Sequence, residues 1–90
     1  FNTFSADCGT IDFDSLAVRT RRPGDRLRLT ASGGSDTLKR LMIGKKIPRE
    51  KRCRLAVFAD RNGIIAVEGL GLDHSRCGSG EMILQLSVEE

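Results

Sequence analysis

Short alternations of hydrophobic and polar residues divide the chain into strand-like segments on either side of a helical middle. Residues 14–20 and 26–30 alternate with a period of two, which predicts two strands. Between them, residues 22–25 (RPGD) are typical of a tight turn, because proline fixes φ and glycine accepts a positive φ. We therefore expect an antiparallel hairpin that displays its arginines on one side.

The middle of the chain changes to helical spacing. Three apolar residues recur at intervals of three and four, so one helix face should bury them: Leu38, Leu41 and Met42. Ser35 or Asp36 can cap the start of this helix, and Gly44 should end it. A second, short helix is expected over residues 49–52, after Pro48.

The second half of the chain returns to strand patterns. Residues 55–59 are apolar and predict a strand, and Asn62-Gly63 favours a type I′ turn after it. Residues 64–67 should form the return strand, buried on both faces or nearly so. A glycine-rich loop follows, and residues 82–88 alternate as a last strand. Grouped helices between strands predict an α+β fold. We expect a small sheet-rich domain of antiparallel or mixed strands, with two short helices after the first hairpin.

Ninety residues provide one domain with a small core. Residues 1–12 show no clear period and are expected to be a flexible or linking segment. The first residue is Phe1 rather than Met, which suggests that residues 1–90 are one domain of a longer protein.

Positive charge is concentrated in one part of the sequence. Thirteen of the fifteen Lys and Arg residues lie between Arg19 and Arg54, where three carboxylates oppose them, so these 36 residues carry a formal charge of +10. The rest of the chain carries −7, from two arginines and nine carboxylates. A surface built from this basic segment (residues 19–54) would attract a polyanion, and its arginines are suited to bidentate contact with phosphate.

Composition narrows the kind of polyanion binder. The chain has no Tyr or Trp, and three of its four Phe lie in the first thirteen residues, away from the basic segment. Binders of single-stranded nucleic acid usually stack bases on aromatic rings, so an aromatic stacking platform is not expected here. If the domain binds nucleic acid, it should do so through phosphates and shape.

The three cysteines are scattered and odd in number, which argues against a disulfide framework and for a reducing compartment. No apolar run approaches the roughly 20 residues of a membrane span, and no signal-peptide pattern is present. We therefore expect a cytoplasmic protein with no membrane partner.

Residues 32–37 (SGGSDT) match the SGGxD[ST] pattern of ATP pyrophosphatases, in which a glycine loop holds a phosphate. The segment before them alternates Arg and Leu, whereas a buried parallel strand should be uniformly apolar. The chain is also too short for a doubly wound nucleotide domain. We interpret residues 32–37 as a helix-capping loop and keep a stand-alone nucleotide enzyme as an alternative.

A metal site is not predicted. His74 and Cys77 form an H-x-x-C beside Asp73, but zinc needs about four ligands and Cys8 and Cys53 are single and distant in sequence.

Three segments resemble the C-terminal domain of bacterial tRNA(Ile)-lysidine synthetase. They are residues 18–26 (VRTRRPGDR), residues 39–48 (KRLMIGKKIP) followed by Arg52 and Arg54, and residues 60–72 (DRNGIIAVEGLGL). The resemblance implies a parent enzyme that uses ATP to adenylate the wobble cytidine of a minor isoleucine tRNA and then joins lysine to it. ATP, with Mg²⁺, would be bound by an N-terminal catalytic domain of the same chain, and the domain in hand would be non-catalytic with no cofactor of its own.

The resemblance also implies that this domain recognises the tRNA, particularly its acceptor stem. Eight basic residues occupy positions of the family motif and are expected to contact RNA: Arg19, Arg21, Arg22, Arg26, Lys39, Lys46, Arg52 and Arg54. Gly24 and Asp25 are expected to support the turn that presents them. The alternative is an inter-domain or protein-interaction module that docks by its basic face on an acidic surface. An oligomer is compatible with either hypothesis.

Overall fold

A four-stranded antiparallel sheet forms the centre of the fold in the computed structural model, which describes residues 3–30, 32–77 and 83–88. Its strand order is β2-β5-β6-β7. The strands span Ala17–Arg19 (β2), Val57–Asp60 (β5), Gly63–Val67 (β6) and Gly71–Leu72 (β7). The α+β, sheet-rich fold class predicted from the sequence is confirmed.

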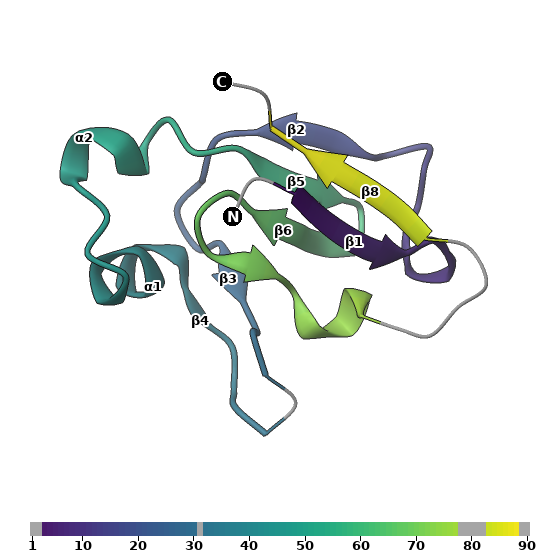
Figure 1. Ribbon diagram of the computed structural model, residues 1–90, viewed down its shortest axis with the longest axis horizontal. Helices are drawn as coiled ribbons and strands as arrows, with labels where there is room; N and C mark the ends of the chain where they lie inside the picture. The colour runs from purple at the N-terminus through teal and green to yellow at the C-terminus, as the bar shows by residue number, and fades with distance from the viewer. Residues whose placement is uncertain (1–2, 31, 78–82, 89–90) are drawn as a thin grey trace.

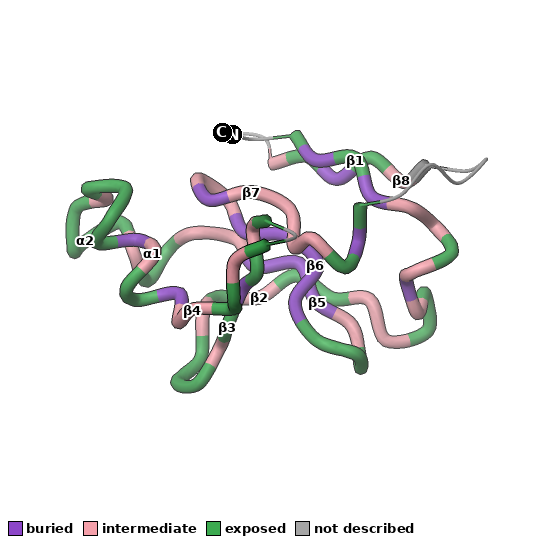
Figure 2. Tube along the Cα trace, turned by 90° about the horizontal axis from the view of Figure 1, so that it is seen from below, coloured by how far each residue is buried: buried purple, intermediate pink, exposed green. Residues whose placement is uncertain are grey.

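A second layer covers one face of this sheet (Figures 1 and 2). It consists of β1 (Thr3–Asp7) and β8 (Ile83–Ser87), which pair antiparallel although they lie at opposite ends of the chain. The 3-10 helix η1 (Cys8–Thr10) leads from β1 towards the sheet. The first core lies between the two layers and contains Phe4, Ala6, Ile11, Phe58, Ile65, Ala66 and Leu86.

The other face of the sheet packs against α1 (Leu38–Gly44) and the β3–β4 hairpin. In that hairpin β3 (Arg26–Leu27) pairs with β4 (Asp36–Thr37). The second core contains Leu27, Leu38, Met42, Val57, Ile64, Val67 and Leu70. The short α2 (Arg49–Arg52) continues from α1 at the same end of the molecule (Figure 1). The two predicted helices are therefore confirmed, with Leu38 and Met42 buried and Leu41 partly buried as expected.

A bulge lets β6 serve both cores. The register between β5 and β6 shifts between Phe58 and Ala59, so that β6 contains one extra residue. Side chains of a regular strand alternate between faces, but Ile65 and Ala66 are adjacent and both belong to the first core. The shift explains this and returns Val67 to the second core. The expectation that residues 64–67 are buried on both faces of the sheet is confirmed.

Pairing of the early strands differs from the prediction. β2 and β3 do not form a hairpin: β2 pairs with β5, and β3 pairs with β4. The turn at residues 22–25 does form, with Gly24 at φ +87° and the Asp25 N–H donating to the Arg22 carbonyl at 3.1 Å. It sends the chain from one sheet into another instead of back along the same one. β2 thereby pairs with the buried strand β5, and β3 pairs with the polar residues that precede α1. The local pattern could not reveal either partner.

Three local predictions are also corrected. Residues 3–7 form β1, with Phe4 and Ala6 buried, although the sequence suggested a flexible or linking segment there. The helix cap is Thr37, whose hydroxyl accepts from the Arg40 N–H at 3.3 Å, and not Ser35 or Asp36. The β5–β6 turn is not type I′, because Asp60 pairs with Gly63 and neither central residue has a positive φ.

A buried ion pair links the loops at the end of β5 and β6. Arg76, in the 3-10 helix η2 (His74–Arg76), is 3% exposed and makes a bidentate pair with Asp60, both N–O distances being 2.7 Å. The same guanidinium donates to the carbonyls of Thr10 and Gly63. Asp60 also accepts from the Asp12 N–H at 2.9 Å. The pair therefore joins η1, η2 and the β5–β6 turn.

This pair should make the protein sensitive to acid. The hydrogen bonds from Arg76 are the main reason that the pKa of Asp60 falls from 3.8 to about 2. Because the folded-state pKa is lowered, the unfolded chain binds the proton first, and stability present above about pH 4 is lost as the pH falls towards 2. We expect this group to contribute about 2 kcal/mol to that loss, measured by urea unfolding at several pH values. Asp60→Asn should flatten the curve in this window, and an unchanged slope in that variant would contradict the assignment.

Candidate nucleic-acid interface

Most of the basic segment lies at one end of the molecule, around the turn at residues 20–25 and the two helices (Figure 1). We call these elements, together with residues 53–54, the basic end. Of the predicted contact residues, Arg21 and Arg22 lie on the turn, Lys39 in the first turn of α1, Lys46 between the helices, and the remaining arginines on β2, β3 and in or after α2. The fold thus brings together arginines and lysines that are up to 33 positions apart in the sequence.

The turn is held by an ion pair between Arg19 and Asp25. The guanidinium donates from Nη1 and Nη2 to the two carboxylate oxygens at 2.8 and 3.0 Å, and the two side chains are only 20% and 12% exposed. Asp25 also accepts from the Arg22 N–H at 2.7 Å, and its carbonyl accepts from the Leu38 N–H at 3.1 Å. Asp25 therefore fixes the turn and attaches it to the start of α1, with the Arg19 guanidinium as its side-chain partner.

The negative charge of Asp25 is neutralised by the neighbouring Arg19. Burial of its carboxyl favours the neutral form, but the hydrogen bonds from Arg19 and from the Arg22 N–H, together with the charges of both arginines, outweigh this and lower the pKa of Asp25. The carboxylate is thus ionised and paired at neutral pH. In this geometry Arg19 orients the turn, and its guanidinium is already committed to Asp25 and to the Thr20 carbonyl.

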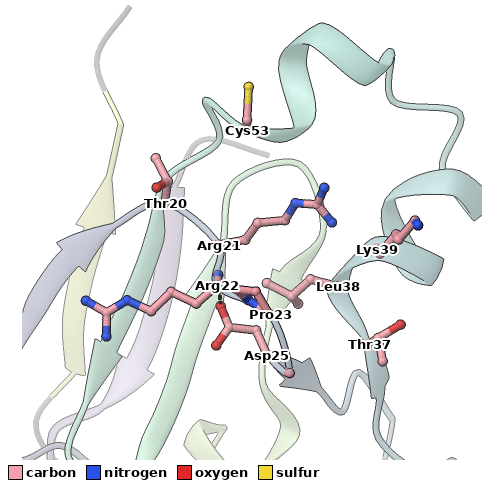
Figure 3. Close-up of a pocket in the computed structure, with 10 residues that line it drawn as sticks. Thr20, Arg21, Arg22, Pro23, Asp25, Thr37, Leu38, Lys39 and Cys53 are labelled. Atoms are coloured by element: carbon pink, nitrogen blue, oxygen red, sulfur yellow. Dashed lines mark hydrogen bonds between the residues drawn. The ribbon is translucent and has the colours of Figure 1, made fainter.

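An open depression lies between the turn, α1 and the residue that follows α2 (Figure 3). Its volume is about 560 Å³. It is lined by Thr20, Arg21, Arg22, Pro23, Gly24, Asp25, Thr37, Leu38, Lys39 and Cys53. Figure 3 shows the Arg21 side chain reaching across towards α1, where Lys39 stands, whereas Arg22 extends in the opposite direction. Adjacent arginines therefore present positive charge on two sides of one turn.

The other predicted contact residues are placed less uniformly. Arg26 is tied to the β3–β4 loop, donating from Nε to the Ser35 hydroxyl at 2.9 Å and from Nη2 to the Ser35 carbonyl at 2.7 Å. Arg52 donates from Nε to the Ile47 carbonyl at 3.0 Å, which closes the link between the helices. Lys46 is exposed with a φ of 59°, and Arg54 is exposed just after α2. None of these four residues lines the depression.

Residues 32–37 occupy a hairpin loop and β4. β4 is antiparallel to β3, so these residues do not follow a parallel strand as a nucleotide-binding loop would. The interpretation of these residues as a loop before a capped helix is confirmed, with Thr37 as the cap in place of Ser35 or Asp36. Across residues 3–30, 32–77 and 83–88, no group of three or more His, Cys, Asp or Glu could hold a metal ion. Over the same ranges, none of the helices is both long and apolar enough to cross a membrane.

Sequence reasoning did not anticipate several residues of the depression. Thr20, Thr37 and Cys53 line it, and Leu38 contributes although it is 1% exposed. No sequence signal marks them, because they meet only when β2, α1 and α2 come together. For Pro23, the sequence predicts only an effect on the backbone.

Comparison with known proteins identifies relatives that match most of the chain. The family described as the TilS substrate C-terminal domain matches residues 16–87. The tRNA(Ile)-lysidine synthase of Clostridioides difficile is 44% identical over 52 residues, which are 58% of this chain and 11% of that protein. The corresponding synthase of Geobacillus kaustophilus is 48% identical over 56 residues, covering 61% and 12% of the two chains. The chain thus spans about a tenth of the length of these curated relatives.

A solved structure described as a TILS C-terminal domain is also similar. It superposes with a TM-score of 0.77 at 30% sequence identity, covering 99% of this chain and 72% of the other. The similarity therefore extends to the β1–β8 layer, which lies partly outside the family match.

Proposed function

The chain belongs to the TilS substrate C-terminal domain family, as its sequence resemblance predicts, and from this we propose that its basic end binds tRNA. The proposal takes the chain as the C-terminal domain of a tRNA(Ile)-lysidine synthase, with the tRNA acceptor stem as its target. The named relatives are synthases of that kind. The observation that carries the proposal is the turn at residues 20–25, where a paired Asp25 holds two arginines apart on a charged surface.

The geometry suits a stem better than a single strand. An A-form helix offers phosphates on both sides of a narrow major groove that side chains cannot read. Arg21 and Arg22 extend in opposite directions from one rigid turn (Figure 3), so they can reach phosphates that are separated along a backbone. Because Arg19 neutralises the charge of Asp25, this carboxylate does not repel the phosphates. Lys39 and Arg54 are exposed at the same end and can extend the contact.

The rest of the enzyme follows by the same proposal. A catalytic domain elsewhere in the parent protein would bind ATP with Mg²⁺ and carry out adenylation and lysine transfer on the wobble cytidine of a minor isoleucine tRNA. The domain in hand would contribute binding energy and no catalytic residue. The parent enzyme would work in the cytoplasm, where its tRNA substrate is found.

A salt titration tests the proposal. Binding of this chain to a fluorescent acceptor-stem hairpin should weaken linearly on a logarithmic scale of salt concentration. With about four phosphate contacts, the slope should be about −3 to −4. The measurement is fluorescence anisotropy between low and moderate salt, with an equally long chain of polyglutamate as the control for nonspecific attraction to acidic polymers.

The outcome separates the two functional hypotheses. Stem binding with the expected slope, and weaker binding of polyglutamate, would support RNA recognition. Absence of stem binding at low salt would contradict it and favour the inter-domain module that docks on an acidic protein surface.

A further inference from the structure

The depression beside the turn is larger than one backbone phosphate requires, and its lining combines cations with apolar residues. We propose that it accepts a single unpaired nucleotide at the end of an RNA stem, with the base lying against the guanidinium plane of Arg21. This inference rests on the proposed RNA-binding function and adds a second mode of contact to it.

The size of the depression is the first reason. At about 560 Å³ it lies within the range of about 300–1,000 Å³ that small-molecule sites occupy. A phosphodiester of a continuous stem would pass across the mouth and leave the interior empty. A nucleotide that leaves the stem can enter it.

The lining is the second reason. Pro23 is exposed and provides apolar surface, and the buried Leu38 is directed towards it (Figure 3). Arg21 and Lys39 provide positive charge next to this surface, and Thr20 and Thr37 are polar residues in the lining. An apolar side chain beside cations fits a group with an aromatic ring and an attached phosphate.

Arg21 takes the place of the missing aromatic residues. Bases in protein–RNA complexes stack on aromatic rings or on guanidinium planes, and the described part of this basic end has no aromatic residue in the lining of the depression. Arg21 is half-buried, and its side chain crosses the space between the turn and α1 (Figure 3). Lysine could supply the charge of Arg21 but could not supply a plane for stacking.

The test compares RNA hairpins that differ only at the open end of the stem. One is blunt, one carries a single unpaired nucleotide at its 3′ end, one carries it at its 5′ end, and matched versions carry an abasic nucleotide instead. We expect one overhang to improve the affinity about fivefold over the blunt stem, and the abasic version to lose most of this gain. The abasic control keeps the phosphate, so it separates stacking from charge.

Two conservative variants identify the residue. Arg21→Lys should abolish the preference for the overhang, whereas Arg22→Lys should retain it, because the Arg22 side chain extends in the direction opposite to that of Arg21 (Figure 3). Both variants keep the net charge, and the readout is the ratio of overhang to blunt affinity, which a general weakening of RNA binding does not change.

Each result decides between the alternatives. Equal affinity for blunt and overhanging stems, an abasic overhang as good as a complete one, or equal ratios in the two variants would overturn the inference while leaving stem binding intact. Failure of the wild-type chain to bind any of the RNAs would instead overturn the proposed function.

Discussion

Replacing Arg76 with alanine is expected to lower the free energy of unfolding by about 3–5 kcal/mol. The variant would leave the Asp60 carboxylate, which is 0% exposed, without its bidentate partner. It would also leave the Thr10 and Gly63 carbonyls without the Arg76 hydrogen bonds. A domain of this size has a total stability on the order of 5 kcal/mol, so the variant should retain no more than about 2 kcal/mol and be only marginally folded at 25 °C. Urea unfolding followed by circular dichroism suits a chain that has no Trp or Tyr.

A matched control is available in Arg61→Ala. Arg61 also pairs with an aspartate, Asp12, but its side chain is 70% exposed, so its loss should cost no more than about 1 kcal/mol. Similar losses in the two variants would show that the burial of the Arg76–Asp60 pair has no special importance. A loss below about 1 kcal/mol for Arg76→Ala would mean that the pair is replaceable by solvent.

The double variant Arg21→Glu, Arg22→Glu is expected to weaken stem binding about hundredfold at low salt. The substitutions remove two phosphate partners and place two negative charges next to the RNA backbone. The salt slope should also become shallower by about two, since two fewer counterions are released. Fluorescence anisotropy with the acceptor-stem hairpin measures both quantities, and circular dichroism verifies that the fold is retained.

Single substitutions separate the effect of a charge's location on RNA binding from the effect of the net charge. Arg22→Gln and Arg61→Gln each remove one charge from an exposed loop arginine. Only Arg22 lies at the basic end, so only Arg22→Gln should reduce the affinity for RNA and the steepness of its salt dependence. If Arg61→Gln reduces binding as much as Arg22→Gln does, the protein attracts RNA only through its overall charge and the proposed interface is misplaced.

The position of Arg19 shows why a list of basic residues is not yet a binding site. Arg19, Arg21 and Arg22 have the same side chain within four positions of the sequence. In the fold, the first pairs with Asp25 and the other two extend from the turn. Arg26 and Arg52 likewise donate to nearby protein oxygens. Charge can be counted along a chain, but the partners of each charge depend on which segments lie beside it.

Features that depend on neighbouring residues could be predicted from the sequence. The spacing of Leu38, Leu41 and Met42 was enough to predict α1, because an apolar face at helical spacing has only one way to be buried. Proline at position 23 and glycine at position 24 were enough to predict the turn, because proline restricts φ and glycine can adopt a positive φ. The basic segment predicted a polyanion, and the order of its motifs predicted the family.

Features that depend on distant partners became visible only in the three-dimensional packing of the chain. β2 could have paired with β3 or with β5, and a three-residue strand does not specify which, because the free energy of pairing comes from the surface that both strands bury together. β1 had no visible period, yet it gains a partner 80 residues away in β8. The burial of Arg76, the commitment of Arg19 to Asp25 and the depression beside Arg21 all arise from this long-range packing. Local sequence patterns do not predict this packing.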